Sequence, residues 1–452
     1  MLEAATNLMK YRSAFLWCLA AMVAFGVGRL VCHRAFDFPV YYQSAKSLVA
    51  GRVDLYAADF AVGPPMVYVY PPLFMLLIFP VGWLSLANAF GAWFALNVLA
   101  TTAVVRLAYR QWTPHNRAQY AWLALALAGP FVVGELKSGN AQLLIVLLLI
   151  GAVVAWSKGK LLTASFCLAL GGAIKIFPLF LLPVLIVRRE WAFVTRTVAL
   201  SCALWLIPAV YFGPRQTVSL YRAWANPLVF HLSRFESQRA LDQSISGAAT
   251  RWLTHLDYSA RLDRNYPQVN RANLSRRAVK AVIYGVDGII LALSLWMCAR
   301  LRRRERDLAN GDYRRLGVAC TAAIFMTFQL LLGPYTPVLY LCGWLLVAMV
   351  LPAVIEQKKF LYNVLLAAGT VNLLLILVPG RMHQRAFQAY GAFTFLGLIL
   401  WEISMASAWI LLRESRESSS SAMLRTHSNS EPELELAGVS TARGSSRRCL
   451  GL

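Results

Sequence analysis

A polar stretch between residues 33 and 80 separates two apolar segments and holds most of the side chains that could do chemistry. Its three carboxylates and three of its tyrosines are Asp37, Asp54, Asp59, Tyr41, Tyr42 and Tyr70. Asp37 lies just beyond the first apolar segment, and residues 38–50 after it have apolar side chains at helical spacing. A carboxylate beside such a surface helix indicates either a general base at the mouth of a membrane-embedded cavity or an ordinary solvated loop. We interpret Asp54 and Asp59 as solvated loop charges.

Lys175 is a second candidate because it stands alone in the apolar segment 161–187, shortly after Gly171-Gly172. An unpaired lysine inside a bilayer costs on the order of 2.5–3.5 kcal/mol by insertion scales. It therefore needs an anionic partner, such as a phosphate, or it must extend to the membrane interface. Both interpretations of Lys175 stay open at this point.

Two further acids, Asp287 and Glu402, lie within predicted membrane helices. Intramembrane carboxylates often mark ion pathways, so an ion-coupled transporter or a flippase is the alternative function. Hydrogen bonding between helices is the simpler interpretation of these acids, and we favour it. The long polar loop in mid-chain and the lack of a visible repeat also disfavour a compact transporter.

The composition indicates that membrane helices position these groups. Of the 452 residues, 58% are hydrophobic and only 14% are charged, whereas soluble domains carry about 25% charged residues. The net charge of +23 comes from basic residues in short connections between apolar runs, as the positive-inside rule predicts, so we expect no nucleic-acid partner. The eight cysteines have no zinc-binding or CxxC spacing, so no metal site is indicated.

The apolar segments predict an all-α polytopic membrane protein with about 11–12 transmembrane helices and a cytoplasmic N-terminus. Seven arginines from Arg300 to Arg315 mark a cytoplasmic loop. Counting back from them makes both the first loop, with Asp37, and the long loop 213–277 external. Residues 1–412 then form one membrane domain, and residues 413–452, rich in Ser, Glu and Arg, are expected to be a disordered cytoplasmic tail.

The topology of the first half has two versions. In one, 72–84 and 88–106 are separate spans, which leaves Arg106 and Arg110 outside. In the other, 72–84 lies at the interface and 161–187 breaks near Gly171-Gly172. The second version turns Lys175 and the Ser138-Gly139-Asn140 turn outward.

The pattern around Asp37 resembles the first external loop of family 87 glycosyltransferases, which are polyprenol-phosphate-mannose-dependent mannosyltransferases of the GT-C superfamily. The matching residues there are Asp37, Tyr41-Tyr42, Gly51, Leu55-Tyr56 and Tyr70-Pro71-Pro72-Leu73-Phe74. The similarity continues through a Lys-x-x-Pro element at Lys175 and through Gln243-Ser244, and it covers roughly residues 30–355.

The resemblance implies a GT-C fold and an inverting transfer of one hexose, with mannose as the expected sugar. The donor would be a polyprenyl-phosphate sugar, and the acceptor a glycolipid or glycan outside a bacterial plasma membrane. The resemblance assigns the base to Asp37 and the phosphate contact to Lys175. Other substrate contacts are expected from Tyr41, Tyr42, Tyr70, Arg234, Arg239, Gln243 and Ser244. No DxD motif for a nucleotide-sugar metal is present, and dependence on a divalent metal stays open.

Two positions depart from the family pattern. Asp242 replaces the asparagine of Asn-Gln-Ser, a change that could alter sugar or acceptor preference. The segment 333–337 replaces a Ser-Pro and histidine pair, so other groups would have to bind the donor phosphate. Arg251, in the long loop, is expected to be solvated.

Overall fold

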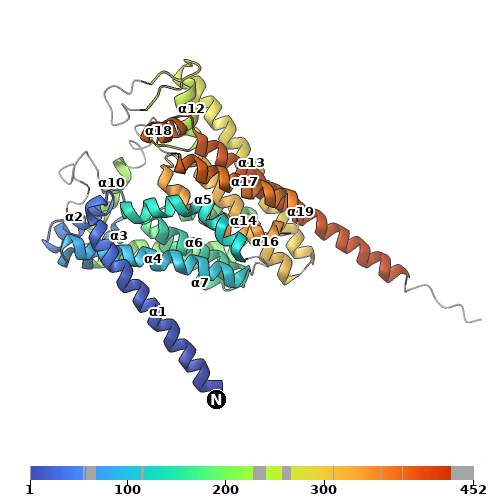
Figure 1. The fold of residues 1–452 in the computed structure, drawn as a ribbon, viewed down its shortest axis with the longest axis horizontal. Helices are drawn as coiled ribbons and strands as arrows, with labels where there is room; N and C mark the ends of the chain where they lie inside the picture. The colour runs from blue at the N-terminus through green and yellow to red at the C-terminus, as the bar shows by residue number, and fades with distance from the viewer. Residues whose placement is uncertain are drawn as a thin grey trace, which may run out of the picture.

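The computed structural model shows a bundle of long helices with two extended arms, α1 and the end of α19 (Figure 1). It describes residues 2–53, 56, 68–112, 117–227, 241–256, 266–308, 310–356, 358–378 and 380–428, without the side chains of 2–15, 117–119, 226–227, 381 and 416–428. Over these ranges no strand forms, and β-type pairing is limited to one bridge between Asp242 and Pro337. The expected all-α fold is confirmed.

Nine helical segments in the described ranges are long and apolar enough to cross a membrane, so the protein is a multi-pass membrane protein. They are Leu16–Arg34, Leu86–Gln111, Tyr120–Ser138, Trp191–Phe212, Arg276–Leu308, Gly311–Leu332, Val338–Ile355, Lys359–Leu377 and Ala392–Ser415. Four shorter apolar segments are Pro72–Trp83, Gln142–Ser157, Leu161–Ile174 and Phe177–Val187. The segments expected as 11–12 spans thus appear as nine full-length helices and four shorter apolar segments, because the segment 161–187 divides in two at Lys175.

The helices have the following bounds. They are α1 Leu2–Val31, η1 Cys32–Arg34, α2 Phe38–Val49, α3 Pro72–Ile78, η3 Phe79–Trp83, α4 Leu86–Gln111, α5 Arg117–Ser138, α6 Gln142–Ser157, α7 Leu161–Ile174, η4 Phe177–Phe180, α8 Leu181–Val187, α9 Trp191–Phe212, α10 Pro214–Pro227, α12 Ile245–Leu253, α13 Arg276–Leu308, α14 Gly311–Leu332, η6 Val338–Gly343, α15 Trp344–Val350, α16 Pro352–Ile355, α17 Lys359–Leu377, α18 Arg381–Ala389 and α19 Ala392–Ser428.

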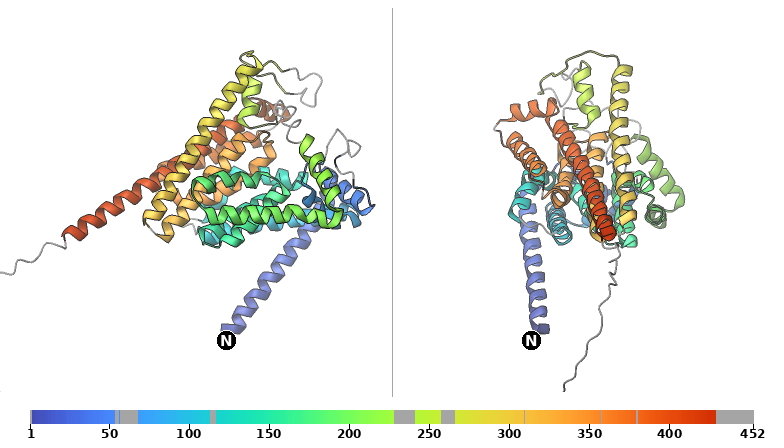
Figure 2. Two further views of the ribbon diagram at one scale, coloured as in Figure 1. Left: turned by 180° about the vertical axis from the view of Figure 1, so that it is seen from behind. Right: turned by 90° about the vertical axis from the view of Figure 1, so that its right-hand side faces the viewer.

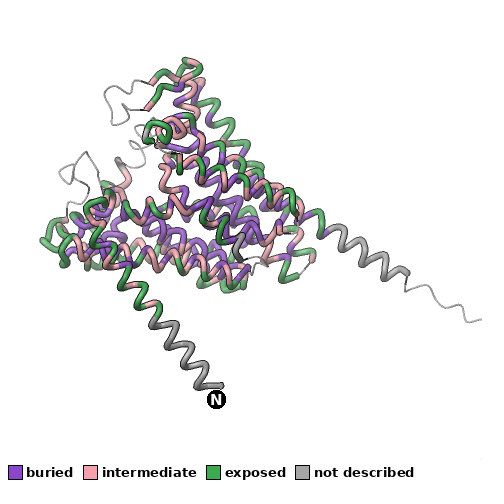
Figure 3. The backbone as a smooth tube through the Cα atoms, viewed as in Figure 1, coloured by how far each residue is buried: buried purple, intermediate pink, exposed green. Residues whose placement is uncertain are grey.

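Helix α14 forms the centre of the bundle and α1 its periphery. Of the most apolar window of each, 83% is buried in α14 and only 11% in α1. Helices α6, α13, α15 and α19 surround α14, and Figure 3 shows the buried backbone concentrated there. The exposed apolar side chains of α1 suit contact with lipid, since α1 packs on α4 at the edge of the bundle and its N-terminal part projects beyond it (Figure 2).

Basic residues gather at one end of the bundle, and their contacts favour one of the two versions of the topology. Arg315 donates to the carbonyl of Gln111, at the end of α4, and Arg314 donates to the carbonyl of Trp156, at the end of α6. The end of α4 therefore lies beside the arginine-rich connection between α13 and α14. In addition, the chain breaks at Lys175, between α7 and η4. Both observations agree with the second version, in which 72–84 does not span.

At the same basic end, the last helix continues beyond the expected domain boundary. α19 runs to Ser428, so Leu412 lies inside a helix instead of at its end. Arg304 donates to the side chain and carbonyl of Ser415, and Lys358 forms an ion pair with Glu414. The arginine and glutamate residues after Leu412 favour helix, which allows α19 to extend. Residues 429–452 lie outside the described part of the chain.

Candidate active site

Asp37 is held against the turn between α5 and α6. The backbone N–H groups of Phe36 and Asp37 both donate to the carbonyl of Ser138, at 3.1 and 2.9 Å. Gly139 follows in the left-handed region, with φ of 74°. A Cβ there would lie 2.6 Å from Cβ of Phe38, so only glycine permits this approach. The turn is further fixed by Trp93, whose Nε1 donates to the Gly139 carbonyl at 2.8 Å.

A chain of hydrogen bonds ends at the carboxylate of Asp37. Tyr41 donates to the hydroxyl of Tyr70 at 2.5 Å, and Tyr70 donates to Oδ1 of Asn140 at 3.1 Å. Nδ2 of Asn140 then donates to Oδ2 of Asp37 at 3.2 Å. Tyr41, Tyr70 and Asn140 are buried. This chain orients the carboxylate as a hydrogen-bond acceptor, which is the state that a general base requires.

Opposing effects set the pKa of Asp37. Burial raises the pKa above its ordinary value and is the largest effect. The hydrogen bond from Asn140 lowers it, as do the positive charge of Lys175 and the hydroxyl of Ser138, without cancelling the effect of burial. Because the side chain is only half-buried, an acceptor hydroxyl can still reach it. A raised pKa makes Asp37 a stronger base than a solvated aspartate.

Lys175 lies at the break between α7 and η4, in extended conformation with φ of −153°. The break folds closely onto α7: a Cβ on Gly172 would lie 2.4 Å from Cγ of Leu179. Nζ of Lys175 donates to Oε1 of Gln142 at 3.3 Å, and only 9% of the residue is exposed. An ammonium held inside the protein does not fit a lysine that extends to the interface.

Aromatic rings surround the ammonium of Lys175. Nζ lies 3.7 Å from the ring centre of Tyr340 and about equally far, 5.5 and 5.4 Å, from those of Tyr70 and Phe177. The face of an aromatic ring stabilises a desolvated cation by about 2 kcal/mol. Tyr70 thus joins both halves of the site: its hydroxyl belongs to the chain that ends at Asp37, and its ring faces Lys175.

Tyr42 occupies a different place from Tyr41. Its hydroxyl donates to the carbonyl of Leu84 at 2.9 Å, and it holds α2 against the segment that precedes α4. The expected substrate contact from Tyr42 therefore has no support from this geometry, whereas Tyr41 and Tyr70 do lie in the network of Asp37.

Asp242, Gln243 and Ser244 join the long loop to the segment 333–337. Oδ1 of Asp242 accepts from the N–H groups of Ser244 and Thr336, both at 3.0 Å. Gln243 donates from its backbone to Thr336 at 2.8 Å, and Ser244 caps α12 by accepting from the N–H of Gly247. Burial raises the pKa of Asp242, and these N–H groups and Arg251 lower it. All three predicted residues are buried, so their clearest role is to connect two loops.

The connection leads towards Lys175. The N–H of Tyr340 donates to the carbonyl of Pro337 at 2.8 Å, and Pro337 pairs with Asp242. The departures at Asp242 and at 333–337 therefore meet in space. They shape the segment that places Tyr340 over the ammonium.

The expectation that Arg251 is solvated is wrong. Only 1% of this residue is exposed, and its guanidinium donates to the carbonyls of Ala389 and Asp242 at 2.9 and 2.6 Å. Its positive charge interacts favourably with the carbonyl groups at the C-terminal end of α18, where the helix dipole favours cations. Arg251 thus fastens α12 to α18.

Several predicted residues do not enter the site. Arg234, Arg239, Asp54 and Asp59 lie outside the described residues. Glu402 is exposed on α19, and Asp287 is half-buried on α13. Neither of these two acids makes an ion pair within the described ranges, and the structure does not gather them with other charges as an ion pathway would require.

Three residues of the site escaped prediction from the sequence as functional groups. They are Asn140, Gln142 and Tyr340. The first two lie at the turn between α5 and α6, and their polar side chains between two apolar helices were the available signal. Tyr340 gave none, because aromatic residues are common in apolar segments.

In the described part of the chain, no three side chains of His, Cys, Asp or Glu are grouped as a metal site would need.

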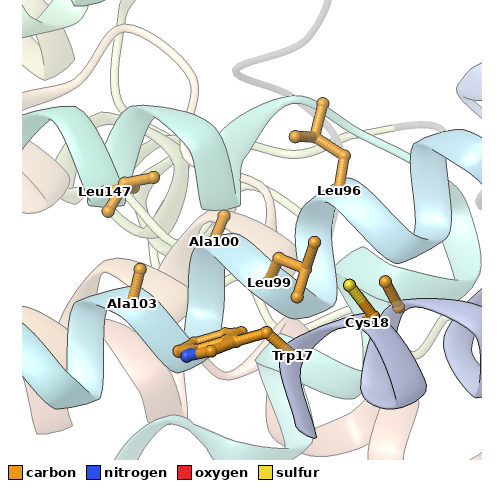
Figure 4. A pocket seen from close by; sticks show the side chains of 8 residues that line it. Trp17, Cys18, Leu96, Leu99, Ala100, Ala103 and Leu147 are labelled. Atoms are coloured by element: carbon orange, nitrogen blue, oxygen red, sulfur yellow. The ribbon is translucent and has the colours of Figure 1, made fainter. Parts of the chain in front are cut away.

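An apolar cavity of about 450 Å³ lies elsewhere, between α1, α4 and α6, lined by residues such as Trp17, Leu99 and Leu147 (Figure 4). Trp17 lies fourteen residues, or about 20 Å along α1, before Val31, where the helix ends and the chain leads on to Asp37. The cavity is therefore well separated from Asp37 along this helix. No charged side chain lines this cavity, so it suits a hydrocarbon chain and supplies no reactive group.

Comparison with known protein families identifies the family of this chain. The sequence model of Glycosyltransferase family 87 matches residues 68–326, more than half of the chain. The chain belongs to glycosyltransferase family 87. The resemblance drawn from the sequence is confirmed. The family 87 match includes Tyr70, Asn140 and Lys175 but begins after Asp37.

Two mycobacterial relatives are named polyprenol-phosphate-mannose-dependent alpha-(1-2)-phosphatidylinositol mannoside mannosyltransferase. The one from Mycobacterium tuberculosis is 28% identical over 200 residues, which cover 39% of this chain and 46% of the relative. The one from Mycolicibacterium smegmatis is 22% identical over 375 residues, which cover 74% of this chain and 73% of the relative. No solved structure matches this family 87 chain significantly.

Proposed function

We propose that this family 87 protein transfers mannose from polyprenyl-phosphate mannose to a hydroxyl group of a glycolipid or glycan. One observation carries the proposal: Tyr70 links a half-buried carboxylate, Asp37, to a buried ammonium, Lys175. A base for the acceptor and a cation for the departing phosphate are what this transfer needs. The names of both mycobacterial relatives support the choice of donor.

In the proposed reaction, the acceptor oxygen attacks the anomeric carbon and forms the new glycosidic bond. The bond between that carbon and the phosphate oxygen breaks, and its electron pair leaves with polyprenyl phosphate. The acceptor proton passes to the carboxylate of Asp37, and the added negative charge on the phosphate faces Nζ of Lys175. A single displacement of this kind inverts the configuration at the anomeric carbon. Asp37 then returns the proton to solvent.

We place the reaction on the outer face of the membrane. The arginines between α13 and α14 lie at the basic end, with the ends of α4 and α6. By the positive-inside rule, such an arginine cluster supports a cytoplasmic position for this end. Asn140 and Lys175 lie at the opposite ends of α6 and α7, beside Asp37 and Tyr340. This arrangement supports a site that is reached from outside.

The test is sugar transfer by the purified full chain in lipid nanodiscs. Synthetic polyprenyl-phosphate mannose carrying a radiolabel is supplied with a membrane extract as the source of acceptors, and the labelled product is identified. We expect label in a glycolipid or glycan with the wild-type protein and at least about 100-fold slower labelling with Asp37→Asn. Transfer from GDP-mannose in place of the lipid donor, or transfer that is equal in both proteins, would overturn the proposal.

A further inference from the structure

Glu135 is a buried carboxylate that the proposed reaction does not use. It lies on the last turn of α5, and only 1% of the residue is exposed. Neither of its carboxylate oxygens accepts a hydrogen bond of normal geometry from the described residues. The backbone N–H of Gln142 acts on it only as a weak donor outside that geometry. A buried carboxylate with so little hydrogen bonding is costly, so this one calls for a ligand that can donate.

Glu135 belongs to the turn that holds the reacting groups. Its carbonyl accepts from the N–H of Gly139 at 2.9 Å and from the hydroxyl of Ser138 at 3.2 Å, and the carbonyl of Ser138 accepts from the N–H of Asp37. On its other side, a Cβ on Gly134 would lie 2.5 Å from Cδ2 of Leu339, the neighbour of Tyr340, which covers the ammonium of Lys175. The backbone at Glu135 therefore lies between the proposed base and the ring that covers the proposed phosphate-binding cation.

The transferred sugar must occupy the space between those two groups. Its anomeric carbon is bonded to the phosphate that faces Lys175, and the same carbon is attacked by the hydroxyl whose proton Asp37 accepts. The phosphate itself is an unsuitable partner for Glu135, because two negative charges in a desolvated site repel. The remaining hydroxyl groups of the hexose are the donors that this space can hold.

We propose that Glu135 binds a pair of neighbouring hydroxyl groups on the transferred hexose, and that it is a specificity-determining residue of the site. This inference rests on the proposed function and names the part of the donor that Glu135 recognises. A carboxylate has two oxygens that can accept from two adjacent hydroxyls at once, as it does from the forked donors of arginine. An epimer or a deoxy sugar leaves one oxygen unpaired in a buried place, which is strongly disfavoured.

The experiment measures binding separately from transfer. Wild type, Glu135→Gln and Glu135→Asp, each as the full chain in nanodiscs, are titrated with polyprenyl-phosphate mannose. The same titrations use its 2-, 3-, 4- and 6-deoxy analogues and polyprenyl phosphate without sugar. Glu402→Gln, the same change at an exposed position of α19, is the matched control.

We expect Glu135→Gln to weaken binding of the mannose donor about 10- to 100-fold, the effect of losing a hydrogen bond to a charged acceptor. Binding of polyprenyl phosphate without sugar should not weaken, because the substitution removes a negative charge near the phosphate, and every affinity should stay unchanged in Glu402→Gln. Two of the deoxy donors lack a hydroxyl that Glu135 binds. Wild type should bind these two more weakly than it binds the mannose donor, whereas Glu135→Gln should bind them about as well as it binds the mannose donor. Such non-additivity identifies a direct contact.

Two results would overturn the inference. One is equal weakening of polyprenyl phosphate with and without sugar, which would mean that Glu135 acts through Lys175 or the fold. The other is strict additivity of the substitution with every deoxy donor. Binding of the mannose donor by wild type without any transfer would instead contradict the proposed function and leave the titrations to decide the role of Glu135. Failure of wild type to bind the donor would overturn both.

Discussion

Nδ2 of Asn140 donates a 3.2 Å hydrogen bond to the carboxylate of Asp37, across 103 residues of sequence. The two residues come from different helical connections, one before α2 and one between α5 and α6. Their contact is what turns a loop aspartate into an oriented acceptor, because Tyr70 and Tyr41 continue the chain behind Asn140.

Asp37→Asn should preserve donor binding while the rate of transfer falls. The amide keeps the size of the side chain but cannot accept the acceptor proton, and general-base catalysis is typically worth about 10²- to 10⁴-fold in kcat. Steady-state transfer by purified protein measures the loss. Asp312→Asn, at a position whose side chain is 83% exposed, should have little effect. Near wild-type transfer by Asp37→Asn would refute the assignment of the base.

The same substitution separates an enzyme from a transporter. An ion-coupled transporter that depends on Asp287 or Glu402 would tolerate Asp37→Asn and fail when either of these acids is neutralised. We expect the reverse pattern, with Asp287→Asn and Glu402→Gln transferring sugar at close to the wild-type rate.

The pH dependence of kcat should reflect the raised pKa of Asp37. Only the deprotonated form accepts a proton, so kcat falls as the pH drops through this pKa, at a pH above the ordinary range of aspartate. Asn140→Ala removes an interaction that lowers the pKa, so it should move the acid limb to higher pH. The pH–rate profiles of wild type and Asn140→Ala measure the shift. An acid limb that moves to lower pH in Asn140→Ala would contradict this account.

Lys175→Ala should raise the KM for the lipid donor while the protein remains inserted and folded. The loss of a buried cation leaves the phosphate without its counter-charge, which we expect to cost about 10-fold or more. Lys137→Ala is the matched control, because Lys137 is exposed on the last turn of α5. Arg251 cannot serve as one, since it is buried against α18. Equal and small effects of the two lysine substitutions would show that Lys175 has only a structural role.

At the basic end of the bundle, Glu305 should make a large contribution to the free energy of unfolding. Both of its oxygens lie 2.8 Å from one Nη of Arg188, which is fully buried, and Arg302 adds a contact at 3.3 Å. Glu305→Ala leaves Arg188 with Glu190 at 4.0 Å, and breaking a buried pair costs about 3–5 kcal/mol.

Asp312→Ala breaks an exposed pair with Arg315 and should cost less than about 1 kcal/mol. Thermal or denaturant unfolding in detergent compares the two variants. A loss for Glu305→Ala no greater than that for Asp312→Ala would mean that the buried ion pair does not hold α8 to α13.

Removing residues 416–452 should leave transfer intact. Arg304 and Lys358 contact Ser415 and Glu414, which the shortened chain keeps. A shortened protein that inserts normally but no longer transfers sugar would assign a role to the removed residues.

The sequence alone was sufficient for the membrane fold and the family. Length and apolarity of segments such as 311–332 are local properties, and the arginines from Arg300 to Arg315 predict an orientation of the chain without reference to any contact. The motif around Asp37 and the lone Lys175 likewise stand out in a linear reading, because a charge in an apolar setting is rare. The helix break at Lys175 was visible through Gly171-Gly172, although only as one of two versions.

Only the tertiary structure decided which polar groups meet. The partner of Asp37 depends on how α2 packs against the turn after α5, and the ring over Lys175 comes from Tyr340, 165 residues away in sequence. Arg251 shows the same limit: a charged residue in a polar loop looks solvated until the carbonyls of Asp242 and Ala389 surround it. Burial and pairing are properties of several segments together, so no pattern within one segment could reveal them.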